Sequence, residues 1–219
     1  LKDRVVLIDI NTRSLIKVLA KVDKPHNNRL NDCKVDAAGR LWFGSMDMNE
    51  KEPSGSLYVL DPSGMIRRVL SEVTISNGIV WSLDNKFMYY IDSPTRKIAV
   101  FKFDLNRGEL IGKVMDIDVS RYAGIPDGMT IDSEGYLWVA MYGGGKVLRI
   151  DPEKGTVVDE VEVPVPYTTS CTFGGNDLVS LYITTARNYP REVEREGDDG
   201  KVFIVDTKVR GYAVNKYLI

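Results

Sequence analysis

The chain has 219 residues, of which 43% are hydrophobic and 27% are charged, and its formal net charge is −2 with acids and bases interspersed. This balance gives no electrostatic reason to expect nucleic acid or an anionic membrane as a partner, and no apolar run reaches the length of a membrane span. The single histidine, His26, excludes zinc sites that are built from several histidines.

Short β-rich runs separated by Gly, Asn, Asp and Pro fill most of the chain, and long amphipathic helical stretches are scarce. This pattern predicts an all-β fold. His26 lies in the polar stretch 24–28, and we expect it to be a solvated loop residue.

A hairpin pattern recurs about every 46 to 50 residues. Each copy begins with a polar residue, continues as a short apolar strand, turns, and enters a second apolar strand. The turn residues of the first three copies are Gly39, Asn85 and Gly135. The copies occupy residues 31–44, 77–90, 127–140 and, more loosely, 170–185, and a further strand follows each of them in 55–64, 96–108, 145–155 or 200–211.

A repeat of this length with about four strands per copy is typical of a β-propeller. One twisted sheet cannot bury both of its faces, whereas sheets packed around an axis bury them and protect most edges. We therefore expect residues 1–219 to form a single propeller domain of about four to five blades. Trp42 and Trp138 hold equivalent places in two copies and are expected to pack between blades.

Three polar residues, Asn31, Asn77 and Asp127, occupy the first position of equivalent copies. If the innermost strands line a channel, these side chains point at a common centre, where a cation would compensate the acid. Carboxylate and amide oxygens are hard ligands that suit Ca²⁺, Mg²⁺ or Mn²⁺ and tolerate Zn²⁺. The alternative is that the Asn-Gly and Asp-Gly pairs are only turns, although each copy already has its own turn residue.

The two cysteines, Cys33 and Cys171, follow no metal-binding or redox spacing. We expect both to be reduced, buried thiols of a cytosolic protein, and a disulfide between them is the alternative.

Four long stretches, 27–46, 75–104, 124–152 and 168–187, closely resemble the regucalcin family of senescence marker proteins, gluconolactonases and luciferin-regenerating enzymes. The resemblance covers nearly the whole chain. It implies a six-bladed propeller with one divalent cation in its central channel. It also implies hydrolysis of sugar lactones such as glucono-δ-lactone, calcium binding, and a cytoplasmic and nuclear location.

The resemblance assigns roles to four residues. Asn77 and Asp127 match two metal ligands of the family, and Arg29 and Asn31 match the substrate contacts of its Arg-x-Asn-Asp motif. The metal would be one divalent cation, and the partner would be a small sugar lactone.

The chain also departs from the family pattern. It starts with Leu rather than Met, and the resemblance implies that it begins within the second blade, so that a metal-binding Glu near the N-terminus has no counterpart. We therefore expect weaker Ca²⁺ binding, because affinity follows the charge of the ligands. The open ring would favour self-association in place of the monomer expected of intact members. The family also has an acidic substrate contact in the loop that follows Gly44. In this chain Asn49 occupies the matching place, and Glu50 is adjacent.

These patterns favour a metal-dependent lactonase. The cation would polarise the lactone carbonyl and acidify a water, Asp127 would be both ligand and general base, and Arg29 and Asn31 would orient the sugar. One alternative is a calcium-binding regulatory propeller without significant turnover. Another is a propeller hydrolase of phosphotriesters or aryl esters, whose pocket would be more apolar.

Overall fold

The all-β prediction is confirmed. The computed structural model describes residues 2–23, 25–187 and 197–218, and within them every regular element is a β-strand except the short 3₁₀ turn η1 (Ser93–Thr95). None of the described residues belongs to a helix that is long and apolar enough to cross a membrane.

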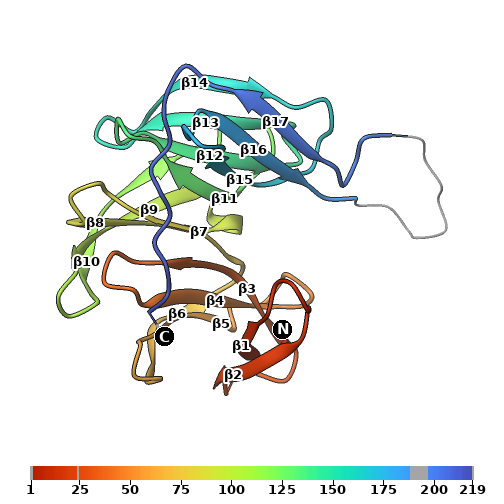
Figure 1. Ribbon diagram of the computed structural model, residues 1–219. Coiled ribbons are helices and arrows are strands. Elements are labelled where there is room, and N and C mark those ends of the chain that lie inside the picture. The colour runs from red at the N-terminus through yellow and green to blue at the C-terminus, as the bar shows by residue number, and fades with distance from the viewer. Residues whose placement is uncertain (1, 24, 188–196, 219) are drawn as a thin grey trace.

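The strands form antiparallel sheets that follow one another along the chain (Figure 1). The N-terminal hairpin has two strands, blades I, II and III have four each, and blade IV has three among the described residues. The hairpin contains β1 (Arg4–Ile8) and β2 (Leu15–Lys21). Blade I contains β3 (Asn28–Val35), β4 (Leu41–Asp47), β5 (Gly55–Leu60) and β6 (Ile66–Val73). Blade II contains β7 (Ser76–Trp81), β8 (Phe87–Asp92), β9 (Lys97–Asp104) and β10 (Glu109–Asp118). Blade III contains β11 (Ile125–Ile131), β12 (Leu137–Tyr142), β13 (Lys146–Asp151) and β14 (Thr156–Glu162). Blade IV contains β15 (Thr168–Gly174), β16 (Ser180–Thr185) and β17 (Val202–Asp206).

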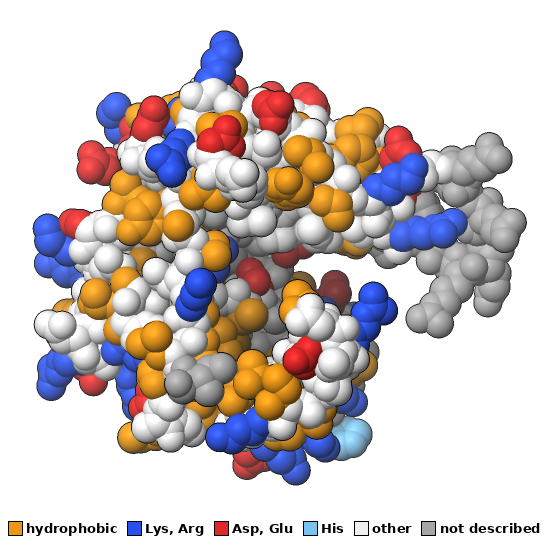
Figure 2. Space-filling model, in the orientation of Figure 1, with side chains coloured by type: hydrophobic (Ala, Val, Ile, Leu, Met, Phe, Trp, Pro, Cys, Tyr) orange, Lys and Arg blue, Asp and Glu red, His pale blue; other side chains and the backbone are white. Residues whose placement is uncertain are grey.

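The blades stack in an arc around a common centre. Their first strands contact one another in order, β3 with β7, β7 with β11 and β11 with β15, so these strands line the inside of the arc. The hairpin stands at one end of the arc and blade IV at the other (Figure 1). Figure 2 shows a hollow between these two ends, with acidic side chains in its depth. The propeller-like arrangement predicted from the repeat is therefore confirmed, with four blades.

The core consists of apolar layers between neighbouring blades. Trp42 and Trp81 lie in the layer between blades I and II, Met129 lies between blades II and III, and Phe173 lies between blades III and IV. Burial of one such side chain contributes about 1.5–3 kcal/mol, so these layers hold the inner strands at a fixed spacing.

The two equivalent tryptophans pack between blades as predicted, and each also anchors a buried acid. The indole N–H of Trp42 donates to Asp36 Oδ2 and that of Trp138 donates to Asp132 Oδ2, both at 2.9 Å. Each aspartate also accepts a hydrogen bond from an arginine Nε and is fully buried. The partners compensate the cost of burying the carboxylates, and the pairs fix the hairpin turns of blades I and III.

The predicted turn residues adopt the backbone conformation that such turns require. Gly39, Asn85 and Gly135 have φ of 77°, 57° and 89°. Glycine and asparagine adopt this left-handed conformation at the lowest cost, which explains why they recur there.

Both cysteines are free, and only one of them is buried. Burial raises the pKa of Cys171 to about 12. Cys33 is exposed, so the expectation of a buried thiol is wrong for that residue. The pairing of β3 with β4 places Cys33 on the same strand face as Leu30, which packs toward the hairpin. The N-terminal hairpin has only two strands, so it covers that face of β3 only in part.

The C-terminal segment, residues 211–218, crosses from blade III to blade I, as the blue trace in Figure 1 shows. Gly211 bridges to Asp132, Asn215 Nδ2 donates to Val35 O at 3.2 Å, and the hydroxyl of Tyr217 donates to Asp61 O at 2.8 Å. The segment therefore ties together blades that are not neighbours.

Candidate active site

An extra residue interrupts the inner strand of every blade at the same place. The register shifts between Leu30 and Cys33 in β3, between Ser76 and Ile79 in β7, between Pro126 and Met129 in β11 and between Thr168 and Ser170 in β15. Such a bulge re-aims the side chains beside it. The first bulge residues are Asn31, Asn77, Asp127 and Thr169.

These four residues line one cavity of about 330 Å³ at the inner ends of the blades. Arg29 lines it as well, so the cavity brings together all four residues that the sequence analysis assigned to the site. Glu50 and Ser93 add polar groups. The remaining wall is apolar and is made by Met46, Ile75, Ile125 and Tyr142.

A chain of hydrogen bonds fixes the two amides. Arg29 Nη1 donates to Asn31 Oδ1 at 2.5 Å, and Asn31 Nδ2 donates to Asn77 Oδ1 at 2.7 Å. Asn77 Nδ2 donates to Ser93 Oγ at 2.7 Å, and Ser93 Oγ donates to Pro126 O at 2.6 Å. Since the Nδ2 atom of Asn77 is committed to Ser93, its Oδ1 atom faces Asn31.

Asp127 is held in a partly buried position where ionisation is costly. Burial, followed by the negative charge of Asp32, raises the pKa of Asp127 from 3.8 to about 7. The backbone N–H of Gly128 and the charge of Arg29 oppose this shift without cancelling it. A carboxyl group that titrates near neutral pH in a cavity is able to exchange a proton with a bound molecule.

The chain was compared with known proteins. The sequence profile of the SMP-30/gluconolactonase/LRE-like region matches residues 1–187. Regucalcin of Oryctolagus cuniculus is 42% identical over 216 residues, which cover 94% of this chain and 70% of that protein. The chain belongs to the SMP-30/gluconolactonase/LRE-like family.

Solved structures agree with this assignment. A luciferin-regenerating enzyme superposes with a TM-score of 0.89 and 32% identity, covering 100% of this chain and 76% of that one. Regucalcin of Agrobacterium tumefaciens, described as a calcium-binding protein, superposes with a TM-score of 0.88 and 28% identity, covering 99% of this chain and 74% of that one.

The donors in the cavity fit a hard divalent cation of the kind that a calcium-binding relative would hold. Within the described ranges, no three His, Cys, Asp or Glu side chains come together as a metal-binding group. The lining offers the carboxylates of Asp127 and Glu50 and the amide oxygens of Asn31 and Asn77. Oxygen donors of this type are those that Ca²⁺ and Mg²⁺ prefer.

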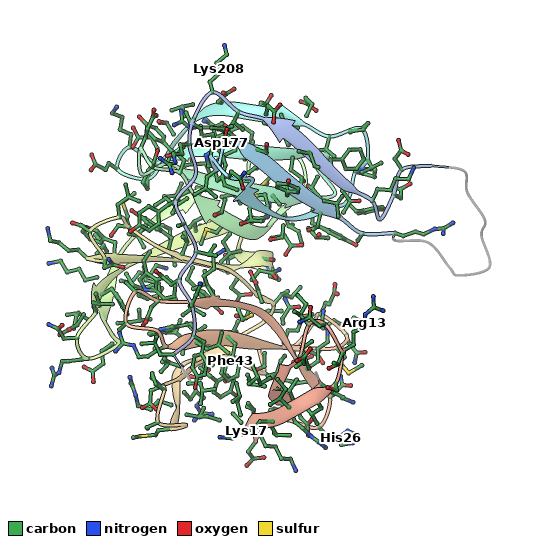
Figure 3. All side chains as sticks on the ribbon, viewed as in Figure 1. Arg13, Lys17, His26, Phe43, Asp177 and Lys208 are labelled. Atoms are coloured by element: carbon green, nitrogen blue, oxygen red, sulfur yellow. The ribbon has the colours of Figure 1, made fainter. Side chains whose placement is uncertain are left out.

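Sequence reasoning missed part of the cavity. Glu50, and not Asn49, lines it, because the loop after β4 places Glu50 in a left-handed conformation with φ of 59°. Ser93 and Tyr142 were also missed, since neither belongs to the repeated position. His26 is exposed and lies beside the hairpin (Figure 3), as expected for a solvated loop residue.

Proposed function

We propose that this member of the SMP-30/gluconolactonase/LRE-like family hydrolyses sugar lactones in the cavity, with one divalent cation bound there. The observation that carries the proposal is the cavity itself, which brings the carboxyl group of Asp127 together with Arg29, Asn31 and Asn77. The gluconolactonase members of the family support the same substrate class.

The chain's residues have distinct tasks in this proposal. Asn77 and Asp127 hold the cation, which supplies polarisation of the lactone carbonyl and a lower pKa of water. An Asp127 carboxylate oxygen accepts a proton from the water whose oxygen attacks the carbonyl carbon. The ring C–O bond then breaks, the ring oxygen takes back the proton that Asp127 accepted, and the product is a hydroxy acid.

Arg29, Asn31 and Glu50 suit a polyol. Arg29 and Asn31 offer donors, the carboxylate of Glu50 accepts, and together they can orient hydroxyl groups around a sugar ring. The apolar wall, with Tyr142 and Met46, faces the same cavity and offers a surface to the C–H face of the ring. The polar lining favours a sugar lactone over the phosphotriesters or aryl esters that a more apolar pocket would accept.

The test is hydrolysis of glucono-δ-lactone by the purified chain, followed with a pH indicator and corrected for spontaneous opening. We expect Asp127→Asn to lower kcat/KM at least about 100-fold, because general base catalysis typically contributes this much. Asp177→Asn changes an exposed acid in blade IV in the same way and should leave the rate unchanged. Equal rates for Asp127→Asn and the wild type would refute the assignment. Ca²⁺ binding without hydrolysis would instead support the calcium-binding alternative.

A further inference from the structure

Ser93 is a polar residue of the cavity to which the proposed function gives no task. It begins the 3₁₀ turn η1 directly after β8, and among the described residues only blade II has such a turn. Ser93 is 0% exposed and lines the same cavity as Asn77 and Asp127. A buried hydroxyl group needs hydrogen-bond partners, and those of Ser93 lie in blade II and blade III.

The hydroxyl of Ser93 has one proton to donate, and the backbone of β11 takes it. Ser93 Oγ lies 2.6 Å from Pro126 O. Since a carbonyl oxygen accepts and never donates, the proton in this contact belongs to Ser93. In its other contact, at 2.7 Å to the side-chain amide of Asn77, Ser93 must therefore accept. Asn77 has to present its Nδ2 atom to Ser93, and not its Oδ1 atom.

The opposite end of the chain of hydrogen bonds requires the same orientation. The guanidinium group of Arg29 can only donate, so Asn31 turns its Oδ1 atom to Arg29 at 2.5 Å. Asn31 then donates from Nδ2 to Asn77 at 2.7 Å, and Asn77 must receive this N–H on its Oδ1 atom. Two ends of fixed polarity, Arg29 on β3 and the carbonyl of Pro126 on β11, thus agree on one orientation of the amide between them.

This orientation decides what Asn77 offers to the cavity. A carbonyl oxygen has two lone pairs, and among the described hydrogen bonds Asn77 Oδ1 accepts one, from Asn31. The second lone pair can bind a cation. A reversed amide would present N–H groups, which repel a cation, whereas oxygen atoms are the donors that hard divalent ions prefer.

We propose that Ser93 is the positioning residue that holds Asn77 as an oxygen donor toward the cation. The inference rests on the proposed function and adds a residue to it. Ser93 touches neither the cation nor the substrate, and it acts through the amide of Asn77. The rival role is to hold the backbone at Pro126, directly before Asp127, and the two roles differ in how Ser93 depends on Asn77.

The experiment is a double-mutant cycle on cation binding with Ser93→Ala, Asn77→Ala and the double variant. Electron paramagnetic resonance of free Mn²⁺ measures the affinity even where binding is weak, and competition gives the affinity for Ca²⁺. We expect Ser93→Ala to weaken binding about fivefold in the wild-type chain, the effect of one lost hydrogen bond. In the Asn77→Ala background the same change should weaken binding less than about twofold, because no amide is left to orient.

Ser45→Ala is the matched control. Ser45 is also 0% exposed and accepts from the backbone N–H of Ser56 at 3.0 Å, but it is not among the described residues that line the cavity. We expect both alanine variants to lower the midpoint of urea unfolding in EDTA, and only Ser93→Ala to weaken Mn²⁺ binding. Ser93→Cys, measured with a reductant present, fills the same space with a weaker hydrogen-bonding group and replaces Ser93→Ala if that variant does not fold.

The outcomes separate the two proposals. Unchanged binding in Ser93→Ala, or an equal loss in Ser45→Ala, would overturn this inference and leave the proposed function intact. An equal loss in the wild-type and Asn77→Ala backgrounds would show that Ser93 acts through the backbone at Pro126, and would also overturn the inference alone. Failure of the wild-type chain to bind either ion would overturn the proposed cation site and this inference with it.

Discussion

At the scale of single residues, the cavity concentrates groups whose presence is costly to the fold. Asp127 is partly buried with a negative neighbour, and its pKa is raised from 3.8 to about 7. Asn31, Asn77 and Asp127 contribute little to packing, since the apolar layers between the blades hold the fold together. Such uncompensated polar groups gather at functional sites, where a ligand compensates them.

The stability of the metal-free protein should therefore depend on pH through Asp127. A carboxyl group with a raised folded-state pKa has no effect below the unfolded value of 3.8, and it destabilises the fold progressively as pH rises toward 7. The full loss in the free energy of unfolding is at most about 4 kcal/mol. We expect Asp127→Asn to be more stable than the wild type in urea unfolding at pH 8 with EDTA, and the difference to vanish near pH 4. A variant that is less stable at pH 8 would contradict the raised pKa.

At the scale of elements, the bulges determine the site. The inner strands share one interruption, whose first residue lines the cavity. In blades II and III the second residue, Gly78 or Gly128, lies close to the inner strand of the next blade. Gly78 and Gly128 are required by this approach and not by an unusual backbone conformation, since neither has a positive φ. The close contact of successive bulges sets the spacing between Asn77 and Asp127.

A methyl group at Gly78 should disturb this contact. Its Cβ would lie 2.8 Å from Asp127 O and from the side chains of Ile91 and Met129, so the strands would have to separate. We expect Gly78→Ala to lower the free energy of unfolding by about 1–3 kcal/mol, as overpacking does, and to weaken Ca²⁺ binding. Gly112→Ala is the matched control, because a Cβ there meets nothing within 4 Å and should change stability by less than about 0.5 kcal/mol. Equal effects of the two substitutions in chemical denaturation would contradict the role of the bulge contact.

The repeat made the fold and most of the ring predictable. Asn31, Asn77 and Asp127 each lie eight residues before a turn residue, and this spacing is visible in the sequence alone. Glu50 depends on the path of a loop, which no periodicity encodes.

At the scale of the whole molecule, the four blades and the hairpin form an arc. The C-terminal segment ties blade III to blade I, which limits how far the arc can open. It does not cover the ends. On the hairpin, Ile10 is 85% exposed and Leu15 is 59% exposed, and on blade IV, Ile204 in β17 is 59% exposed. Among the described residues β17 is the outer strand of blade IV, so its outer edge adds backbone groups without a strand partner to that apolar surface.

These surfaces should cause the 219-residue chain to self-associate. Apolar area removed from water contributes about 25 cal/mol per Å², so pairing the arc ends of two chains would be favourable. Light scattering during size-exclusion chromatography should give a mass above that of one chain which rises with loading concentration. The double substitution Ile10→Glu and Leu15→Glu should restore the single-chain mass, because it places charges on the hairpin. Val158→Glu alters an exposed apolar residue on the outer strand of blade III and should not restore it. A single-chain mass at every concentration would show that the apolar ends of the arc do not pair.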